Sequence, residues 1–155
     1  MPRKECRGFT LIELIASITI IAILGAVAWP RLSSSSQPYA ERGYADGVAA
    51  SLRQARAVAI ASGCDVRFTI TAAGYNAFQR GAAANNHCAV AGAWVTPVQR
   101  GDGQSLLAMA PAGAALAVNR QFVFGADGSV VGGAVNITIG PQVIDVNASG
   151  VAYGP

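Results

Sequence analysis

One acidic residue stands inside an otherwise uncharged stretch near the start of the sequence. Glu13 is the only charged residue among the 21 residues from Phe9 to Trp29. An ionisable group inside an apolar segment costs about 2.5–3.5 kcal/mol on membrane-insertion scales, so such a group is by default functional. A carboxylate among packed apolar helices is tolerated only when it is paired. Glu13 is therefore predicted to be a pairing residue; the alternative is that its carboxylate reaches the headgroups at the cytoplasmic membrane face.

The rest of the sequence offers little material for catalysis or metal binding. His87 is the only histidine, and it precedes Cys88 directly. One histidine beside an oxidised cysteine is poor material for a nucleophilic site, and the pair lacks the further ligands that zinc requires. The sequence contains no phosphate-binding glycine motif and no calcium loop. We expect an exposed loop histidine, no enzymatic activity and no cofactor.

The length and composition exclude several classes of protein. With 155 residues the chain has room for one domain, and its 52% hydrophobic and 12% charged residues exclude a disordered, acidic or coiled-coil protein. Eighteen glycines and 7% aromatic residues indicate a loop-rich β protein, with helix confined to the first third. Most of the net charge of +3 lies in the first eight residues, so it is weak evidence for a nucleic-acid-binding face.

The apolar segment that contains Glu13 is long enough to cross a membrane as a helix. A helix over Phe9–Trp29 would be about 31 Å long, which matches the hydrocarbon thickness of a bilayer. Arg3, Lys4 and Arg7 precede the segment, so its start should remain cytoplasmic and the rest of the chain should lie outside the cytoplasm. A secretory signal peptide cleaved after Ala28 is the competing interpretation, but such a peptide has no use for Glu13.

The residues Gly8-Phe9-Thr10-Leu11-Ile12-Glu13 resemble the class III signal of type IV pilins and type II secretion pseudopilins. The likeness includes a short basic leader, glycine at the cleavage point, phenylalanine next and glutamate at the fifth mature position. It implies that a prepilin peptidase cuts between Gly8 and Phe9 and that the new amine of Phe9 is methylated. By the same resemblance, Glu13 would pair with the N-terminal amine of a neighbouring subunit during assembly.

A proline follows the apolar segment at a position where many pilins also have one. Pro30 has no amide hydrogen and clashes with the carbonyl four residues earlier, so a helix through it should bend or break. An apolar stripe at helical spacing then resumes and ends at Gly63, a natural helix stop. The stripe consists of Tyr44, Val48, Leu52, Ala55, Ala59 and Ser62. This stripe should pack on a sheet.

Arg53 and Arg56 flank this stripe and could contact DNA phosphates or a partner, although a solvated face is the favoured interpretation. Some minor pilins look to have a C-terminal Gly-Arg-x-Arg element that could contact DNA phosphates. The corresponding tail here, Gly150–Tyr153, has no arginine. DNA binding would then fall to arginines elsewhere in the chain and is not favoured. These are Arg53, Arg56, Arg67, Arg80, Arg100 and Arg120.

Two of the three cysteines should lie outside the cytoplasm. Cys6 belongs to the expected leader and would be lost on cleavage, which leaves Cys64 and Cys88. A disulfide between them is the default expectation in an oxidising compartment, and two free thiols are the alternative.

Beyond Gly63 the hydrophobic period changes to two, as in strands. Strands are expected at Val66–Ile70, Tyr75–Gln79, Ala93–Val98, Phe122–Phe124, Val130–Val131, Val135–Ile139 and Val143–Val146, ending at Tyr153, with an uncertain one near Leu106. Pro97 should place its strand at an edge. The Arg-x-x-Arg-Ala sequence at Arg53 and the Phe124-x-x-x-Gly128 turn are similar to the GspH/FimT family of minor pilins and pseudopilins.

The sequence thus predicts a pilin-like α+β protein with a long N-terminal helix on an antiparallel β-rich head. We expect a leader at 1–8, a transmembrane helix at 9–29, a periplasmic helical half at 30–63 and the head at 64–155. The resemblance implies a FimT-like minor pilin in type IV pilus assembly or initiation, with twitching and DNA uptake as further roles. A GspH-like pseudopilin at the tip of a type II secretion filament, or a DNA receptor, is the alternative. Expected partners are the prepilin peptidase, other pilins or pseudopilins and the inner membrane.

Overall fold

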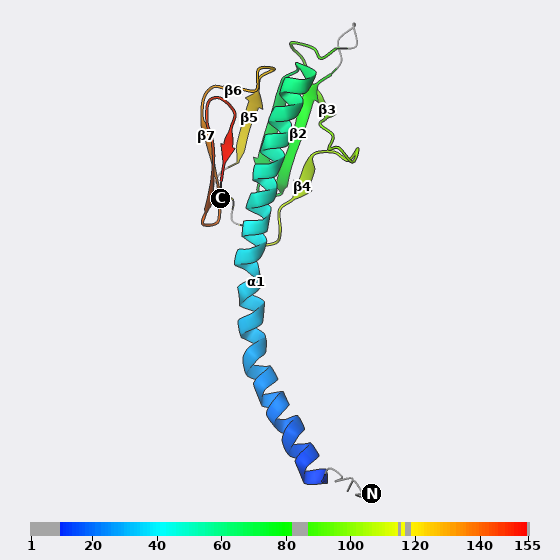
Figure 1. The fold of residues 1–155 in the computed structure, drawn as a ribbon, viewed down its shortest axis with the longest axis vertical. Coiled ribbons are helices and arrows are strands. Elements are labelled where there is room, and N and C mark those ends of the chain that lie inside the picture. Colours follow the sequence, from blue (N-terminus) through cyan, green and yellow to red (C-terminus); the bar gives the residue numbers. More distant parts are fainter. Residues whose placement is uncertain (1–9, 82–86, 115, 117–118, 155) are drawn as a thin grey trace, which may run out of the picture. The chain divides into compact units, whose positions relative to one another are not determined.

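The computed structural model describes residues 10–81, 87–114, 116 and 119–154; within 28–37 it describes the backbone alone. The chain divides into two compact units, Met1–Ser36 and Gln37–Pro155. A long helix, α1 (Leu11–Ser62), belongs to both, and every strand lies in the second unit (Figure 1). The expected α+β class with a β-rich head is confirmed.

Helix α1 runs without interruption through Pro30 and Pro38. Of the two outcomes predicted for Pro30, a break is therefore wrong, and a bend stays a prediction. The helix ends where the sequence predicts, since Gly63 has a φ of 65° and follows the last helical residue, Ser62. A left-handed residue at this position ends a helix, and glycine adopts it without strain.

In the described part of the chain, no helix is sufficiently long and apolar to span a bilayer. The membrane helix expected at 9–29 stays a prediction.

The predicted apolar stripe of α1 is buried in the second unit. Tyr44, Val48, Leu52, Ala55 and Ala59 all belong to the core, while Ser62 is half-buried. The stripe is wider than its expected spacing, because Ala45, Ala49 and Ser51 are buried as well.

The larger sheet is antiparallel and carries six strands. Its order is β3 (Trp94–Pro97), β2 (Gly74–Arg80), β1 (Val66–Thr71), β5 (Arg120–Phe124) and β6 (Val130–Val131), and β4 (Leu107–Met109) pairs with β2 as well. Phe68 in the central strand lies opposite Ala77 on one side and Phe122 on the other. Pro97 lies in the edge strand β3, as predicted from its missing amide hydrogen.

A second antiparallel sheet contains β7 (Val135–Ile139), β8 (Gln142–Val146) and β9 (Ala152–Tyr153). Its inward residues Ile137, Ile139 and Ile144 join the same core as the helix stripe. Four aromatic rings fill the centre of that core along the larger sheet, with neighbouring centroids 5.4–5.9 Å apart. They are Tyr75, Phe68, Phe122 and Phe124. The second unit thus has a continuous core of its own.

Candidate functional site

Glu13 lies in the first turn of α1, where it takes part in a cap of the helix start. The amide nitrogen of Glu13 donates to the hydroxyl oxygen of Thr10 at 3.3 Å. In return, the amide nitrogen and the hydroxyl of Thr10 donate to Glu13 Oε2 at 3.5 Å and 3.3 Å. This reciprocal arrangement is a capping box, and it satisfies backbone donors that a helix start leaves unpaired.

Thr10 is a participant that our interpretation of the sequence missed. A threonine three residues before a glutamate, at the start of an apolar run, is the usual signature of a capping box and could have identified it. Glu13 is exposed in the single chain, and its carboxylate also gains from the positive end of the helix dipole. The single chain therefore gives Glu13 a partner in its own helix.

The following turns of α1 expose large apolar side chains on every side of the helix. Exposed fractions in this stretch range from 46% to 77%. The residues are Leu11, Ile12, Leu14, Ile15, Ile18, Ile20, Ile21, Ile23, Leu24 and Val27. A helix that is apolar all round is normally covered by lipid or by other protein.

The structure does not describe two of the predicted residues and describes only the backbone of a third. The expected cleavage point, Gly8 and Phe9, lies outside the described residues, and so does the side chain of Pro30. The peptidase, methylation and bending roles given to them stay predictions.

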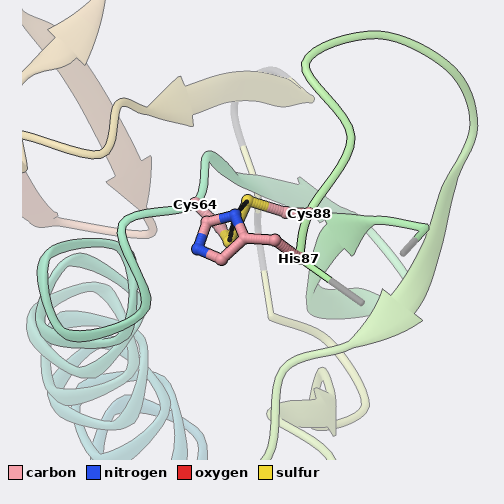
Figure 2. Close-up of side chains that lie close together, drawn as sticks. All are labelled: Cys64, His87 and Cys88. Carbon is pink, nitrogen blue, oxygen red and sulfur yellow. Dashed lines mark hydrogen bonds between the residues drawn. A yellow bond between two sulfur atoms is a disulfide. The ribbon is translucent and has the colours of Figure 1, made fainter. Parts of the chain in front are cut away.

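At the far end of α1, Cys64 and Cys88 form the expected disulfide. The bond joins the residue after the helix stop to the segment between β2 and β3, across a separation of 24 residues. The alternative of two free thiols is wrong for this structure. The disulfide lies in an open hollow of about 280 Å³, where His87 sits beside it (Figure 2). His87 is exposed, as predicted.

Two family profiles match the sequence, and together they cover both units. The profile of the prokaryotic N-terminal methylation motif matches residues 3–29, which include the capped start of α1 and its apolar turns. The profile of the type II transport protein GspH matches residues 44–150, more than half of the chain. The chain belongs to the GspH family. This confirms the resemblance to GspH/FimT pilin-like proteins, whose members are structural subunits of type IV pili or type II secretion systems. No protein of curated function and no solved structure matches the chain.

Within the GspH match, Arg56 has a structural role. Its Nε donates to the carbonyl oxygen of Gly128 at 3.1 Å, which ties α1 to the turn between β5 and β6. Gly150 packs against the same place, because a Cβ there would collide with the Gly128 carbonyl oxygen and approach Arg56. Arg56, Gly128 and Gly150 therefore form a close contact of three segments. We found no signal for this contact in the sequence beyond the glycines themselves.

The Phe124-x-x-x-Gly128 turn expected from the sequence is present in this GspH head, and Asp127 precedes its glycine. The backbone amide and the hydroxyl of Ser129 both donate to the Asp127 carboxylate, at 2.9 Å and 2.7 Å. These hydrogen bonds, the backbone one first, lower the pKa of Asp127 below its ordinary value. The turn holds the Gly128 carbonyl toward Arg56.

The other candidate arginines also contact their own chain. Arg67 and Arg80 lie over the Trp94 ring, at 5.3 Å and 4.3 Å from its centroid. Arg100 donates to the Tyr75 hydroxyl, and Arg120 donates to the Asn136 carbonyl oxygen. Among the six arginines weighed for DNA, Arg53 remains as an exposed cation on the helix flank. The DNA or partner contacts predicted for Arg53 and Arg56 stay predictions.

Proposed function

We propose that this GspH-family chain is a FimT-like minor pilin, a structural subunit that helps to assemble or initiate a type IV pilus. The observation that carries the proposal is the order of its parts. A methylation-motif match over 3–29 precedes a GspH match over 44–150, and one continuous helix joins them. Roles in twitching and DNA uptake would follow from membership of such a pilus.

In this proposal the apolar turns of α1 exchange one apolar environment for another. Before assembly they lie in the inner membrane, with the N-terminus cytoplasmic and the head periplasmic. After assembly the helices of neighbouring subunits replace the lipid. The exposed apolar side chains from Leu11 to Val27 support this exchange, because each environment would cover them.

Glu13 sets the register of assembly in the same proposal. The methylated amine of Phe9 from a neighbouring subunit pairs with the Glu13 carboxylate, since an unpaired carboxylate among packed helices is costly. The capping box with Thr10 supports this role, because its hydrogen bonds keep the Glu13 carboxylate at the helix start before it pairs with a neighbouring subunit.

A minor pseudopilin of a type II secretion system, located at the filament tip, is the second candidate. It is favoured by the description of the matching profile, which names a type II transport protein. Both candidates require the same processing and the same helix packing, so they differ in their partners.

Processing is tested by the intact mass and N-terminal sequence of the protein recovered from its native membrane. We expect a chain that begins at N-methylated Phe9. A chain that begins at Trp29 would mean an ordinary secreted domain and would remove the roles given to Gly8, Phe9 and Glu13.

The two filament systems are distinguished by a photo-crosslinking amino acid at Met109, which is 86% exposed on β4. Crosslinked neighbours are identified in cells by mass spectrometry. Type IV pilins among the products support the minor-pilin proposal, whereas secretion pseudopilins would replace it with the second candidate. The same protein kept without irradiation gives the background.

A further inference from the structure

The hollow at the end of α1 gathers three side chains that can bind a metal ion. The Sγ atoms of Cys64 and Cys88 and a ring nitrogen of His87 lie within 4.8 Å of one another (Figure 2). Cys64 is fixed by the helix stop, because its amide donates to the Ala59 carbonyl oxygen of the last helical turn. Thiolate and imidazole are the ligands that zinc prefers in proteins.

The two nitrogen–sulfur distances are close to those of a tetrahedral zinc site, whereas the two sulfurs are bonded at 2.05 Å. With Zn–S near 2.3 Å and Zn–N near 2.0 Å, ligand atoms lie about 3.5 Å apart for S and N and about 3.8 Å apart for two sulfurs. His87 Nδ1 lies 3.3 Å from the Cys88 sulfur and 3.9 Å from the Cys64 sulfur. The nitrogen thus already has the required spacing, and only the two bonded sulfurs would have to separate.

We propose that the reduced form of this protein binds Zn²⁺ through Cys64, His87 and Cys88. A dithiol reductant breaks the Cys64–Cys88 bond, becomes a disulfide itself and leaves two thiols on the protein. Zn²⁺ then replaces the two thiol protons, which pass to water, and the imidazole supplies the third ligand. The fourth position faces the open hollow and takes a water molecule.

The charges around the hollow are compatible with this site. Two thiolates balance the charge of Zn²⁺, so the bound ion would not repel the guanidinium of Arg80, which also lines the hollow. The metal would restore the link between the end of α1 and the segment before β3 that the disulfide makes in the oxidised chain. The zinc site rests on the geometry of the head and not on the proposed filament function.

Cobalt is a suitable probe, because its spectrum reports thiolate ligands and tetrahedral geometry. The experiment uses the full chain in detergent with a Cys6→Ser substitution, which removes the remaining thiol. The protein is reduced with a dithiol, freed of reductant without oxygen and titrated with Co²⁺. We expect one equivalent to bind with a thiolate-to-cobalt charge-transfer band, Zn²⁺ to displace it, and the oxidised protein to show neither. No band in the reduced chain would overturn the proposal.

Two variants separate the three-ligand site from adventitious thiol binding. His87→Ala removes the nitrogen ligand. Loss of a residue that only supports a metal ligand already weakens binding by about 10-fold to 100-fold, so Co²⁺ binding should weaken by no less. Thr96→Val changes the wall of the hollow without removing a ligand and should bind as tightly as the parent. Equal affinity in His87→Ala and the parent would exclude the histidine as a ligand and overturn the proposal.

The reduced chain could lose structure before it meets the metal, so circular dichroism accompanies each titration. Zinc sites often couple binding to folding. If reduction unfolds the head, Zn²⁺ should restore the spectrum of the oxidised protein, and failure to do so would equally overturn the proposal. A Cys64→Ser/Cys88→Ser variant should remain unaffected by Zn²⁺.

Discussion

At the residue scale, Glu13 has a partner in its own helix, and the proposed filament would offer it a second one. In the single chain its carboxylate accepts hydrogen bonds from Thr10 and faces the positive end of the helix. In the proposed filament an amine of another subunit takes that place. A carboxylate that is hydrogen-bonded within its own chain is tolerated in a low-dielectric environment, and a cationic amine then offers it a stronger partner. Charge and capping should therefore be separable by substitution.

Glu13→Gln is expected to preserve the helix start and abolish filament entry. Glutamine can still fill the second position of a capping box, but it has no charge to pair with an amine. We expect normal processing by the peptidase and a loss of the subunit from sheared filaments, measured by immunoblotting of processed chain in each fraction. Thr10→Ser keeps the hydroxyl and should assemble normally. Unchanged incorporation of Glu13→Gln would show that the charge is not used.

Gly150→Ala is expected to destabilise the head more than Gly132→Ala does. Both glycines have a positive φ, 81° and 95°, so alanine is strained at each by about 1–2 kcal/mol. Gly132 has open space where a Cβ would stand, whereas Gly150 packs on the Gly128 carbonyl oxygen and on Arg56. Chemical denaturation should give a total loss of about 3 kcal/mol for Gly150→Ala. Equal losses would mean that the contact with Gly128 relaxes without cost.

At the element scale, sequence periodicity was sufficient for most of the fold. Val66, Phe68 and Ile70 alternate with polar residues, and all three are buried in β1. Such alternation is a local signal of a half-buried strand, so it can be recognised without a partner. The edge strand β4 has only three residues and is held by pairing to β2, so a short local pattern supported only an uncertain prediction near Leu106.

The hydrogen bonds between distant polar side chains had no signal in the sequence, unlike the Cys64–Cys88 disulfide, which was expected from the cysteine count. Ser51 donates to the Tyr75 hydroxyl at 2.7 Å in the core, and Arg100 donates to the same oxygen. Each residue taken alone looks like an ordinary helix, strand or loop residue. That His87 lies beside the disulfide follows from its position before Cys88, but the distances from its ring nitrogen to the two sulfurs could not be predicted. Of the candidate sites, the position of Glu13 in the first turn could be predicted, whereas the hollow could not.

The contact between α1 and β2 should weaken at high pH because of Tyr44. Burial first, and the neighbouring Tyr75 second, raise the pKa of Tyr44 from 10.0 to about 12. Its hydroxyl has no hydrogen-bond partner among the described residues. A raised pKa means that the folded state holds the proton more tightly than the unfolded state. This contribution to stability is complete below pH 10 and is lost as pH rises toward 12.

The pH effect is measured by urea unfolding at pH values from 9 to about 12. The parent chain should lose stability across this window, and Tyr44→Phe should lose less of it because phenylalanine cannot ionise. Tyr39→Phe, which alters a residue 78% exposed on the same helix, is the matched control and should follow the parent. Identical curves for all three proteins would show that Tyr44 does not contribute to the loss.

At the scale of the whole molecule, the second unit contains the hydrophobic core, and the first exposes apolar side chains that are suited to association. The described buried hydrophobic residues all lie at Tyr44 or later in the sequence. They come from the second half of α1 and from both sheets. The described large apolar residues before Tyr39 are exposed. A core that is complete in one unit supports folding of that unit alone, while an exposed apolar helix supports association.

A fragment that contains only Gln37–Pro155 is therefore expected to fold when it is exported to an oxidising compartment. It retains the helix stripe, both sheets and the Cys64–Cys88 disulfide, so its thermal unfolding should be cooperative and close in midpoint to that of the full chain in detergent. Leu52→Ala in the fragment removes a fully buried side chain and should lower its stability by about 2–5 kcal/mol, which verifies that the transition reports the native core.

The fragment should remain soluble and absent from filaments, because it lacks the apolar turns that lipid or neighbouring helices would cover. A fragment without a cooperative transition would mean that the core depends on residues before Gln37, and a fragment recovered in filaments would mean that the head alone carries the assembly contacts.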